Sequence, residues 1–429
     1  MSKLFIYCIL WFSCTAWGEN QAINQSEQNN VFGVIQLGPF AAVDLIQKGD
    51  YNRTAVVQFG INPVGTITQQ GNYNRAVVFQ ISDTSTLNIF QDGVFNITSI
   101  SQNSASPVGN LSQSSLNTLV NNFLFAPETL ASQTELTQIK TLSFNTSLLS
   151  RLDHPLSKRF TVFGGRNLAE GQHSDRLGAI GFDYNITTSM IGGEMQLAPN
   201  LRLGLALQRS KTDGDVNYGL ANIDIHSTQF SIFGSVNIEQ LFMDFAAAYG
   251  NNDYKINRPG FDSPVSSNHE GYDVSLSTRA GYLFKHKFLK FGPVFELNYI
   301  KTNIDNYQEL GNVLLTQIVD EQINEFLIGE VGVQLRYGSH NFSTFTNLTL
   351  EHDFTIEEFR VIDSSYSMSP DKKVFIPVSD FKHRNSVRLQ SGLDVEIDFG
   401  LELSFLVDFR FNNDDTDAWM VGANVNYPF

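Results

Sequence analysis

Cysteine, histidine and long hydrophobic runs are scarce in this chain of 429 residues, and each scarcity excludes a class of function. The two cysteines, Cys8 and Cys14, both lie near the N-terminus, and no histidine precedes His154. The N-terminal region therefore lacks the residues for Ser-His or Cys-His catalysis and for a His-ligated metal. No run of about 20 apolar residues follows the N-terminal segment, so no transmembrane helix is expected.

Positive charge is also in short supply. The chain has 44 acidic and 28 basic residues and a net charge of −16. A phosphate backbone is bound by Lys and Arg, so this balance argues against a nucleic-acid partner. The sequence has no Gly-x-Ser-x-Gly block of a hydrolase, and Asp414, Asp415 and Asp417 are interpreted as a solvated acidic loop. We therefore expect no enzyme, no cofactor and no metal site.

The N-terminus has the features of a secretory signal. Lys3 precedes an apolar stretch from Leu4 to Trp17, and Ala16-Trp17-Gly18 provides small residues around a cleavage site. We expect residues 1–18 to be removed. Both cysteines would leave with them, and the mature chain would form no disulfide.

A strict glutamine register follows the signal. Nine glutamines stand eleven residues apart, and the residue two positions before each of them is aliphatic. Gly or Ser usually follows two positions later, where the backbone has to turn. Alternation inside the unit indicates a strand with one face buried, so each unit is one strand and one turn. The glutamines are Gln25, Gln36, Gln47, Gln58, Gln69, Gln80, Gln91, Gln102 and Gln113.

A second period of 22 residues doubles the first. Aromatic residues recur at this spacing as Tyr51, Tyr73 and Phe95, and each is followed by an asparagine, namely Asn52, Asn74 and Asn96. Two strands therefore make one coil of a β-solenoid. Stacked coils would place identical side chains in ladders, in which buried amides hydrogen-bond to one another. A single unpaired amide would instead cost about 1–3 kcal/mol when buried.

The repeat resembles the curlin family. Its pattern is Ser, five residues, Gln-x-Gly-x-x-Asn-x-Ala, three residues and Gln. Residues 85–102 follow it from Ser85 to Gln102 except for Thr98 in place of Ala, and 69–80 fit its second half at every position. Residues 47–58 depart at Thr54, and Pro63 and Ala41 replace the leading Ser. Curlins are subunits of extracellular amyloid fibres, so the resemblance implies a surface that assembles or nucleates; a solenoid without an assembly role is the alternative.

From residue 158 onward the chain alternates in polarity over many short segments. Leu401 to Phe411 alternates apolar residues with Glu402, Asp408 and Arg410, for example. Apolar residues toward lipid and polar residues toward a lumen are the pattern of an outer-membrane barrel. We predict twelve strands, joined alternately by short turns and long loops, near residues 158–166, 180–197, 201–212, 227–238, 241–253, 270–284, 289–301, 325–337, 342–353, 385–397, 401–411 and 417–429.

The region before the barrel and the last strand resemble an autotransporter. Residues 121–157 have leucines at near-helical spacing, and Pro127 suits a first helical turn. The chain ends on Val425, Tyr427 and Phe429, which resembles the signal read by the barrel assembly machinery. The resemblance implies a helix that threads the barrel and links it to a secreted passenger. Asn121-Asn122 matches the family's cleavage pattern poorly, so we expect the passenger to stay attached.

The predicted fold is all-β: a 12-stranded outer-membrane barrel with a plugging linker helix, preceded by a short curlin-like solenoid. The domains are a signal peptide (1–18), a passenger (19–120), a linker with pore helix (121–157) and the barrel (158–429). The expected function is surface display for adhesion, biofilm formation or fibre nucleation by strand-edge templating. Expected partners are outer-membrane lipid, the barrel assembly machinery, and curlin-type subunits or host or abiotic surfaces. The alternatives are a non-polymerising adhesin or spacer, and a barrel acting as a pore or enzyme.

Overall fold

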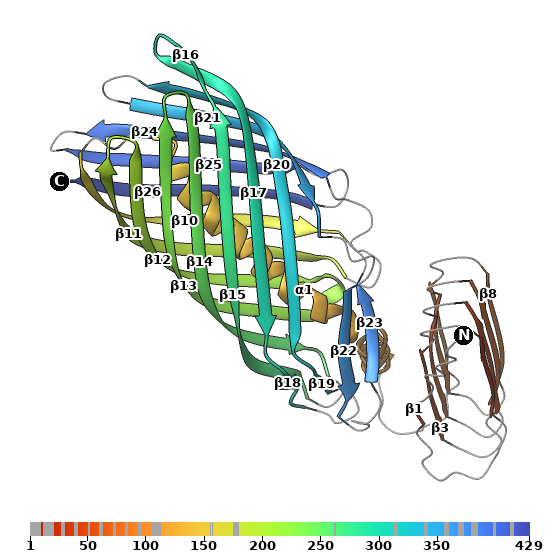
Figure 1. The fold of residues 1–429 in the computed structure, drawn as a ribbon. Coiled ribbons are helices and arrows are strands. Elements are labelled where there is room, and N and C mark those ends of the chain that lie inside the picture. Colours follow the sequence, from red (N-terminus) through yellow and green to blue (C-terminus); the bar gives the residue numbers. More distant parts are fainter. Residues whose placement is uncertain are drawn as a thin grey trace, which may run out of the picture.

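The architecture is that of a computed structural model, which describes most of the chain. The described residues are 10–11, 21–26, 31–37, 42–49, 52–59, 63–71, 74–81, 85–92, 97–103, 113–154, 156, 158–174, 180–260, 263–311, 316–338, 342–355, 360–367, 373–378, 385–397, 400–411 and 416–429. Figure 1 shows two β-structures, a large barrel containing a helix and a smaller stack of short strands beyond one barrel mouth.

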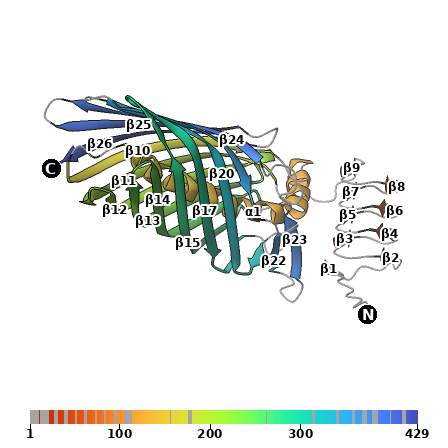
Figure 2. The ribbon, with the colours of Figure 1, turned by 45° about the horizontal axis from the view of Figure 1, so that its top comes forward.

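The smaller structure is a stack of parallel strands in two sheets (Figure 2). One sheet is ordered β1-β3-β5-β7-β9 and contains Leu10–Trp11, Val31–Leu37, Arg53–Phe59, Arg75–Ile81 and Ile97–Asn103. The other is ordered β2-β4-β6-β8 and contains Gln21–Ser26, Ala42–Lys48, Pro63–Gln70 and Ser85–Asp92. Successive strands of the chain alternate between the sheets, so two strands form each coil, as the 22-residue period predicts.

Aliphatic residues from both sheets form the solenoid core. The described aliphatic residues two and four positions before the glutamines face inward, which explains why the position two before is always aliphatic. The buried set is Val43, Leu45, Val56, Ile67, Ala76, Val78, Leu87 and Ile89. The intervening residues Asp44, Lys48 and Asn88 are exposed, so each strand alternates as the sequence predicts.

The large structure is a closed antiparallel barrel of twelve strands, as predicted. β10 pairs with both β11 and β26 and so closes the sheet. β16 is a three-residue extension that follows β15 in the chain. The strands are β10 (Phe160–His173), β11 (Phe182–Ala198), β12 (Leu201–Val216), β13 (Ala221–Ile238), β14 (Leu241–Arg258), β15 (Val265–Tyr282), β16 (Phe284–His286), β17 (Leu289–Ile304), β20 (Gln322–Gly338), β21 (Phe342–Asp353), β24 (Asn385–Ile397), β25 (Leu401–Phe411) and β26 (Thr416–Pro428).

One long helix, α1 (Gln113–Arg151), passes through the barrel lumen (Figure 1). Its C-terminal Arg151 donates to Asn426 near the end of β26, on the side of the short turns. Gln133, nearer its start, donates to Tyr307 on the side of the long loops. No helix among the described residues is long and apolar enough to cross a membrane by itself. The helix starts eight residues earlier than the predicted linker, and Pro127 lies inside it rather than in its first turn.

Two long loops contain more structure than the sequence indicates. Residues 302–324 and 354–384, read as loops, contribute a four-stranded sheet ordered β18-β19-β22-β23. Its strands are β18 (Tyr307–Gln308), β19 (Gln317–Val319), β22 (Arg360–Tyr366) and β23 (Lys373–Val378). A short 3-10 turn, η1 (Asn217–Gly219), joins β12 to β13. Figure 1 places the extra sheet at the mouth where α1 enters.

Several barrel strands are longer than predicted, because their polarity inverts along their length. In the half of β12 nearer the short turns, Leu205 points outward and is 51% exposed, whereas Gln208 is buried. Near the long-loop end Val216 is buried and Asp215 is exposed, and Ile223 of β13 is likewise buried. A membrane strand needs about 9–11 residues, and β12 to β15 have 16 to 18. These ends therefore rise into water, where apolar residues face inward.

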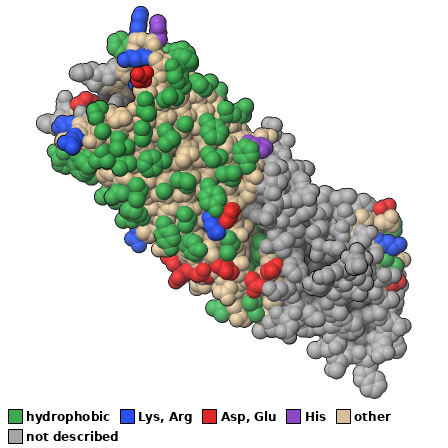
Figure 3. Space-filling view, viewed as in Figure 1, with side chains coloured by type: hydrophobic (Ala, Val, Ile, Leu, Met, Phe, Trp, Pro, Cys, Tyr) green, Lys and Arg blue, Asp and Glu red, His purple; other side chains and the backbone are tan. Residues whose placement is uncertain are grey.

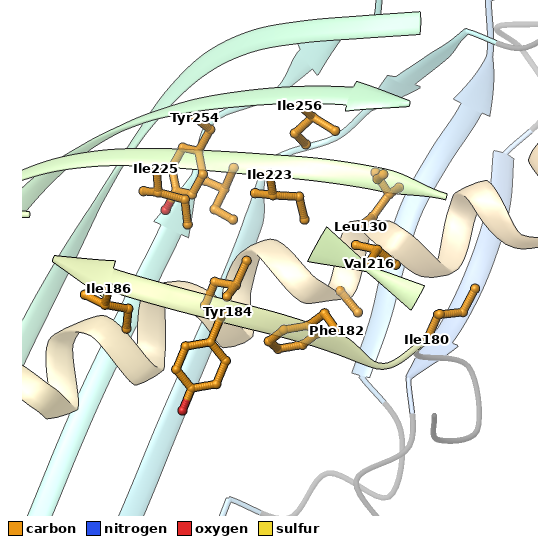
Figure 4. Packing of buried hydrophobic residues seen from close by; sticks show 14 of the residues in the cluster. Leu130, Ile180, Phe182, Tyr184, Ile186, Val216, Ile223, Ile225, Tyr254 and Ile256 are labelled. Atoms are coloured by element: carbon orange, nitrogen blue, oxygen red, sulfur yellow. The ribbon is translucent and has the colours of Figure 1, made fainter. Parts of the chain in front are cut away.

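The inverted ends form an apolar core around residues 130–139 of α1. Figure 4 shows Leu130 of the helix beside Val216, Ile223 and Ile256 of the barrel wall. Ile362 of β22 and Val319 of β19 belong to the same buried cluster. The outer half of the lumen is thus packed like the interior of a soluble protein.

Candidate functional site

Inside the membrane part, α1 is held by buried ion pairs. Lys140 of the helix contacts Asp273 of β15 at 2.7 Å, and neither side chain is exposed. The Lys140 ammonium also donates to Asn252 at 2.7 Å and to Ser227 at 3.2 Å. Thr141, one residue on, donates to the second Asp273 oxygen at 2.9 Å. Burying a charge is costly unless it is paired and hydrogen-bonded, and this site meets both conditions.

A second cluster joins the helix to the opposite wall. Arg388 of β24 pairs with Asp408 of β25 at 2.6 Å and with Glu330 of β20 at 2.7 Å. The same guanidinium donates to the Thr146 hydroxyl of α1 at 2.7 Å. The planar guanidinium of Arg388 can donate several hydrogen bonds at once, which suits a site with several acceptors.

The end of α1 carries the densest charge. Arg151 donates to Glu194 at 2.7 Å and lies 3.6 Å above the Phe163 ring. Asp153, just past the helix, accepts from Arg279 at 2.8 Å and lies 2.7 Å from Arg336. The last helix residue and the turn after it are therefore fixed to three strands of the wall, β11, β15 and β20.

At the outer mouth the helix contacts stacked rings, and Arg258 and Glu309 form a buried ion pair beside Tyr307. His269 lies parallel to Tyr307, with ring centroids 3.7 Å apart, and to Tyr254 at 5.1 Å. Its Nε2 is 2.8 Å from the Gln133 side-chain oxygen. Burial raises the pKa of the Tyr307 phenol above its ordinary value. His269 lies in β15 and supports the helix through Gln133.

The solenoid contains a continuous ladder of glutamine amides. Gln47 donates to Gln69 at 2.8 Å, and Gln69 donates to Gln91 at 2.7 Å. Thr54 of the opposite sheet also donates to Gln69, at 2.8 Å. All three glutamines are buried. The ladder thus satisfies the amides on one another, as the sequence predicts.

The predicted asparagine ladder is present between Asn52 and Asn74, the two of its residues that the structure describes. The Asn74 backbone N–H donates to the Asn52 side-chain oxygen at 2.9 Å, and Asn52 donates to the Gly71 carbonyl at 2.8 Å. Gly71 has a φ of 97°, which suits its place in the turn. Tyr51, Tyr73, Phe95 and Asn96 lie outside the described residues.

The strand register places the other glutamines in two columns. Gln25 pairs with Gln47 in the β2–β4 sheet. The second sheet aligns Gln36, Gln58, Gln80 and Gln102. Gln113 is an exception, because it is the first residue of α1 and belongs to no strand. The two columns therefore contain eight of the nine glutamines, and the passenger gives way to the helix before residue 120.

The last strand presents its alternating residues outward. Val425, Tyr427 and Phe429 are 49%, 48% and 60% exposed. Phe429 donates its backbone N–H to Phe160 at 2.7 Å, so the chain end is fixed beside the start of β10. Phe160 and Phe429 rings lie 5.8 Å apart in an aromatic belt at the short-turn end.

Which lumen residues hold the helix could not be listed from the sequence. The sequence gives only a weak indication of Lys140, Asp153 and Asp273. The first two are charged residues in or next to a predicted helix, and Asp273 is a charged residue at an inward position of a strand. In the described residues, no group of three or more His, Cys, Asp or Glu side chains is placed to hold a metal ion. Asp414 and Asp415 lie outside the described residues, whereas Asp417 pairs within the barrel.

Comparisons with known proteins match this geometry. The family model of the autotransporter beta-domain matches residues 161–408, more than half of the chain. The translocator domain of the autotransporter NalP from Neisseria meningitidis is similar at a TM-score of 0.59 and 16% identity, covering 70% of this chain and 98% of that one. The beta domain of the Bordetella autotransporter BrkA gives a TM-score of 0.48 at 16% identity and covers 63% and 100%.

The transport unit of the autotransporter AIDA-I from Escherichia coli gives a TM-score of 0.48 at 14% identity, and covers 71% of this chain and 99% of that one. No curated protein matches the chain. At 16% identity the likeness to the NalP domain concerns the fold alone.

Proposed function

The chain belongs to the autotransporter family, and from that premise we propose that its outer-membrane translocator barrel displays the solenoid at the cell surface. The direction of α1 supports this display. The helix enters by the long-loop mouth and ends at the short turns. Long loops face the outside in outer-membrane barrels and short turns face the periplasm. The solenoid, which precedes the helix, then lies outside.

The proposed role of the solenoid is curlin-like adhesion, biofilm formation or fibre nucleation. The observation that carries it is the buried ladder from Gln47 through Gln69 to Gln91. Identical amides stacked in register are the chemistry of cross-β assemblies. A terminal strand of such a stack has unpaired N–H and C=O groups and can pair with another chain.

We propose further that the passenger stays attached. The buried contacts of Lys140 and Asp153 hold the helix in place, and a chain that is not cut between the solenoid and these residues keeps the solenoid on the cell. The signal peptide, the barrel assembly machinery as partner and the absence of catalysis are parts of the same proposal.

The test is fibre nucleation by whole cells that express the full chain. A purified curlin-type subunit is added, and thioflavin fluorescence reports the lag before fibres form. We expect a shorter lag with the native chain than with a chain whose residues 21–103 are deleted. Gln69→Ala should lengthen the lag, and Gln70→Ala, which changes the exposed neighbour, should not. An equal lag for the native and deleted chains would contradict nucleation.

An adhesin that does not polymerise is the second candidate. Phe90 on the outer face of β8 is 68% exposed and supports it. Phe90→Ser should reduce attachment of cells to surfaces while the nucleation lag stays unchanged, if this candidate holds. The pore or enzyme alternative has less support, because Lys140 of α1 and Asp273 of the wall bury their charges against one another.

A further inference from the structure

The outward face of the barrel has a row of polar side chains on three adjacent strands. Arg166 of β10 lies directly opposite Ser189 of β11, and Ser189 lies directly opposite Arg209 of β12. All three residues are exposed. Asn167, the next residue after Arg166, points into the lumen and donates to Ser147 of α1. Because successive residues of a strand point to opposite faces, Arg166 and its two partners in the row face away from the lumen.

Apolar side chains surround this row on the same face. Ile191 and Leu207 occupy the next outward positions toward the short turns on β11 and β12, and both are exposed. Leu168, the next outward residue of β10 toward the long loops, is also apolar and exposed. Arg166 therefore lies within the lipid-facing surface. On β12 the outward residues beyond Arg209 are charged, so Arg209 marks the outer boundary of that surface.

The two arginines differ from another outward cation of the barrel in having no acidic partner. Lys301 of β17 forms an ion pair with Glu325 of β20 at 2.9 Å. In the part of the chain that the structure describes, no carboxylate forms an ion pair with Arg166 or Arg209. The barrel wall thus leaves two guanidinium groups of one row without a counter-charge.

Acidic residues are nevertheless the commoner charge in this chain, with 44 against 28 basic residues. Figure 3 shows acidic side chains on the outside of the barrel near the mouth that α1 enters, beside a wall covered by apolar side chains. A basic side chain that faces acyl chains destabilises a membrane barrel. An anion from outside the chain would offset this cost for Arg166. Because the side chains around the row face lipid, we expect this anion to be part of a lipid.

We propose that Arg166 and Arg209 bind the phosphate group of an anionic lipid in the outer leaflet. The residues are two strands apart, which places their backbones ~10 Å from each other, so both side chains can reach one phosphate near Ser189. Guanidinium groups bind phosphate through paired hydrogen bonds. The hydroxyls of Ser189 and Thr187, neighbouring outward residues of β11, are further donors.

The position of the row fits a lipid with its headgroup toward the long loops. Long loops face the outside in outer-membrane barrels, so such a lipid belongs to the outer leaflet. The apolar stem of an arginine can lie against acyl chains while its charge extends to the headgroup level. The acyl chains of the lipid would then cover Ile191 and Leu207. The inference is independent of what the solenoid does.

The experiment measures how strongly the purified full chain retains lipid. Protein in a non-ionic detergent is mixed with diphosphoryl lipid A, which is a phosphorylated glycolipid, or with phosphatidylcholine, whose net charge is zero. Native mass spectrometry counts the lipid molecules retained. We expect lipid A to be retained more strongly than phosphatidylcholine. The double variant Arg166→Gln/Arg209→Gln should lower the affinity for lipid A about fivefold for each arginine lost. Added salt should lower it further.

Lys255→Gln is the matched control, because it removes an exposed lysine from the outward face of β14. It should retain lipid A as the native chain does. Arg166→Lys/Arg209→Lys keeps both charges but loses the paired hydrogen bonds, and its affinity should lie between those of the native chain and the glutamine variant. The gel shift between unheated and heated samples, without lipid A, shows that each variant is folded.

The proposal fails if the native chain retains both lipids equally. It also fails if either double variant retains lipid A as strongly as the native chain does. Competition by inorganic phosphate at the concentration of lipid A would overturn it as well and indicate a site for free phosphate.

Discussion

Lys140 of α1 and Asp273 of β15 form an ion pair at 2.7 Å that is closed to solvent on both sides. Five further hydrogen bonds, involving Ser227, Gln229, Asn252 and Thr141, complete the site. A helix that crosses an aqueous pore would be held only loosely. Here the wall provides specific partners for the one lysine of the buried helical segment, so helix and barrel form a single folded unit.

Removal of one partner should destabilise the barrel strongly. Asp273→Ala leaves the Lys140 ammonium buried without a carboxylate, and a broken buried pair costs about 3–5 kcal/mol. The free energy of unfolding, from urea titration in lipid vesicles, should fall by that amount. The double variant Lys140→Met/Asp273→Leu should recover most of the loss, since an apolar pair avoids the cost of desolvation. A double variant no more stable than Asp273→Ala would contradict this account.

The contact of Asp153 with Arg279 and Arg336 should keep the short-turn mouth closed. Asp153→Asn removes the charge shared by the two guanidinium groups, and Arg336 then repels Arg279 at close range. We expect the end of α1 to loosen and the conductance of single barrels in planar bilayers to rise. Asp213→Asn, at a partly exposed site on the barrel exterior, is the control and should leave the conductance unchanged. Equal conductance of both variants would show that other contacts close this mouth.

The lipid-facing strands could be predicted because lipid lies outside the barrel and polar groups lie inside it. The residues along each strand therefore alternate between apolar and polar. β24 and β25 have the predicted bounds of 385–397 and 401–411. β13 and β15 do not, since each starts five or six residues before the predicted 227 and 270. In those stretches Ile223 and Ile225 face inward and Asp224 faces water. The membrane pattern is reversed there. A strand prediction based on apolar residues that face lipid therefore ends at the membrane boundary.

The solenoid ladder was predictable for a related reason. A parallel stack aligns residue i with residue i+22, so the sequence period fixes every neighbour, including Gln47 beside Gln69. The lumen has no such repeat. Contacts such as Arg388 to Thr146 join residues 242 positions apart and depend on the rotation of α1 inside the barrel. The period of the strands does not set that rotation.

Substitution of a buried glutamine in the middle of the ladder should destabilise the solenoid more than substitution of an exposed glutamine on the same strand. Gln69→Ala removes the acceptor of Gln47 and Thr54 and the donor to Gln91. Buried polar groups left unpaired cost about 1–3 kcal/mol each. We expect the solenoid to be cut by protease under conditions in which the barrel remains intact. Gln70→Ala changes an exposed side chain on the same strand and should be cut as slowly as the native chain. Equal protection of both variants would show that the aliphatic core alone sustains the coil.

Loss of the terminal aromatic residue, Phe429, should reduce assembly of the barrel more than it reduces the stability of the assembled barrel. Phe429 is 60% exposed, and its ring contacts Tyr427 at 4.7 Å and Phe160 at 5.8 Å. Phe429→Ala should lower the amount of folded barrel in the outer membrane, measured by the gel shift between unheated and heated samples. Phe411→Ala provides a matched control, because it removes a 52% exposed ring from the end of another strand. If loss of lipid-facing area were the cause, both variants would assemble equally poorly. A selective defect in Phe429→Ala would indicate recognition of the chain end by the assembly machinery.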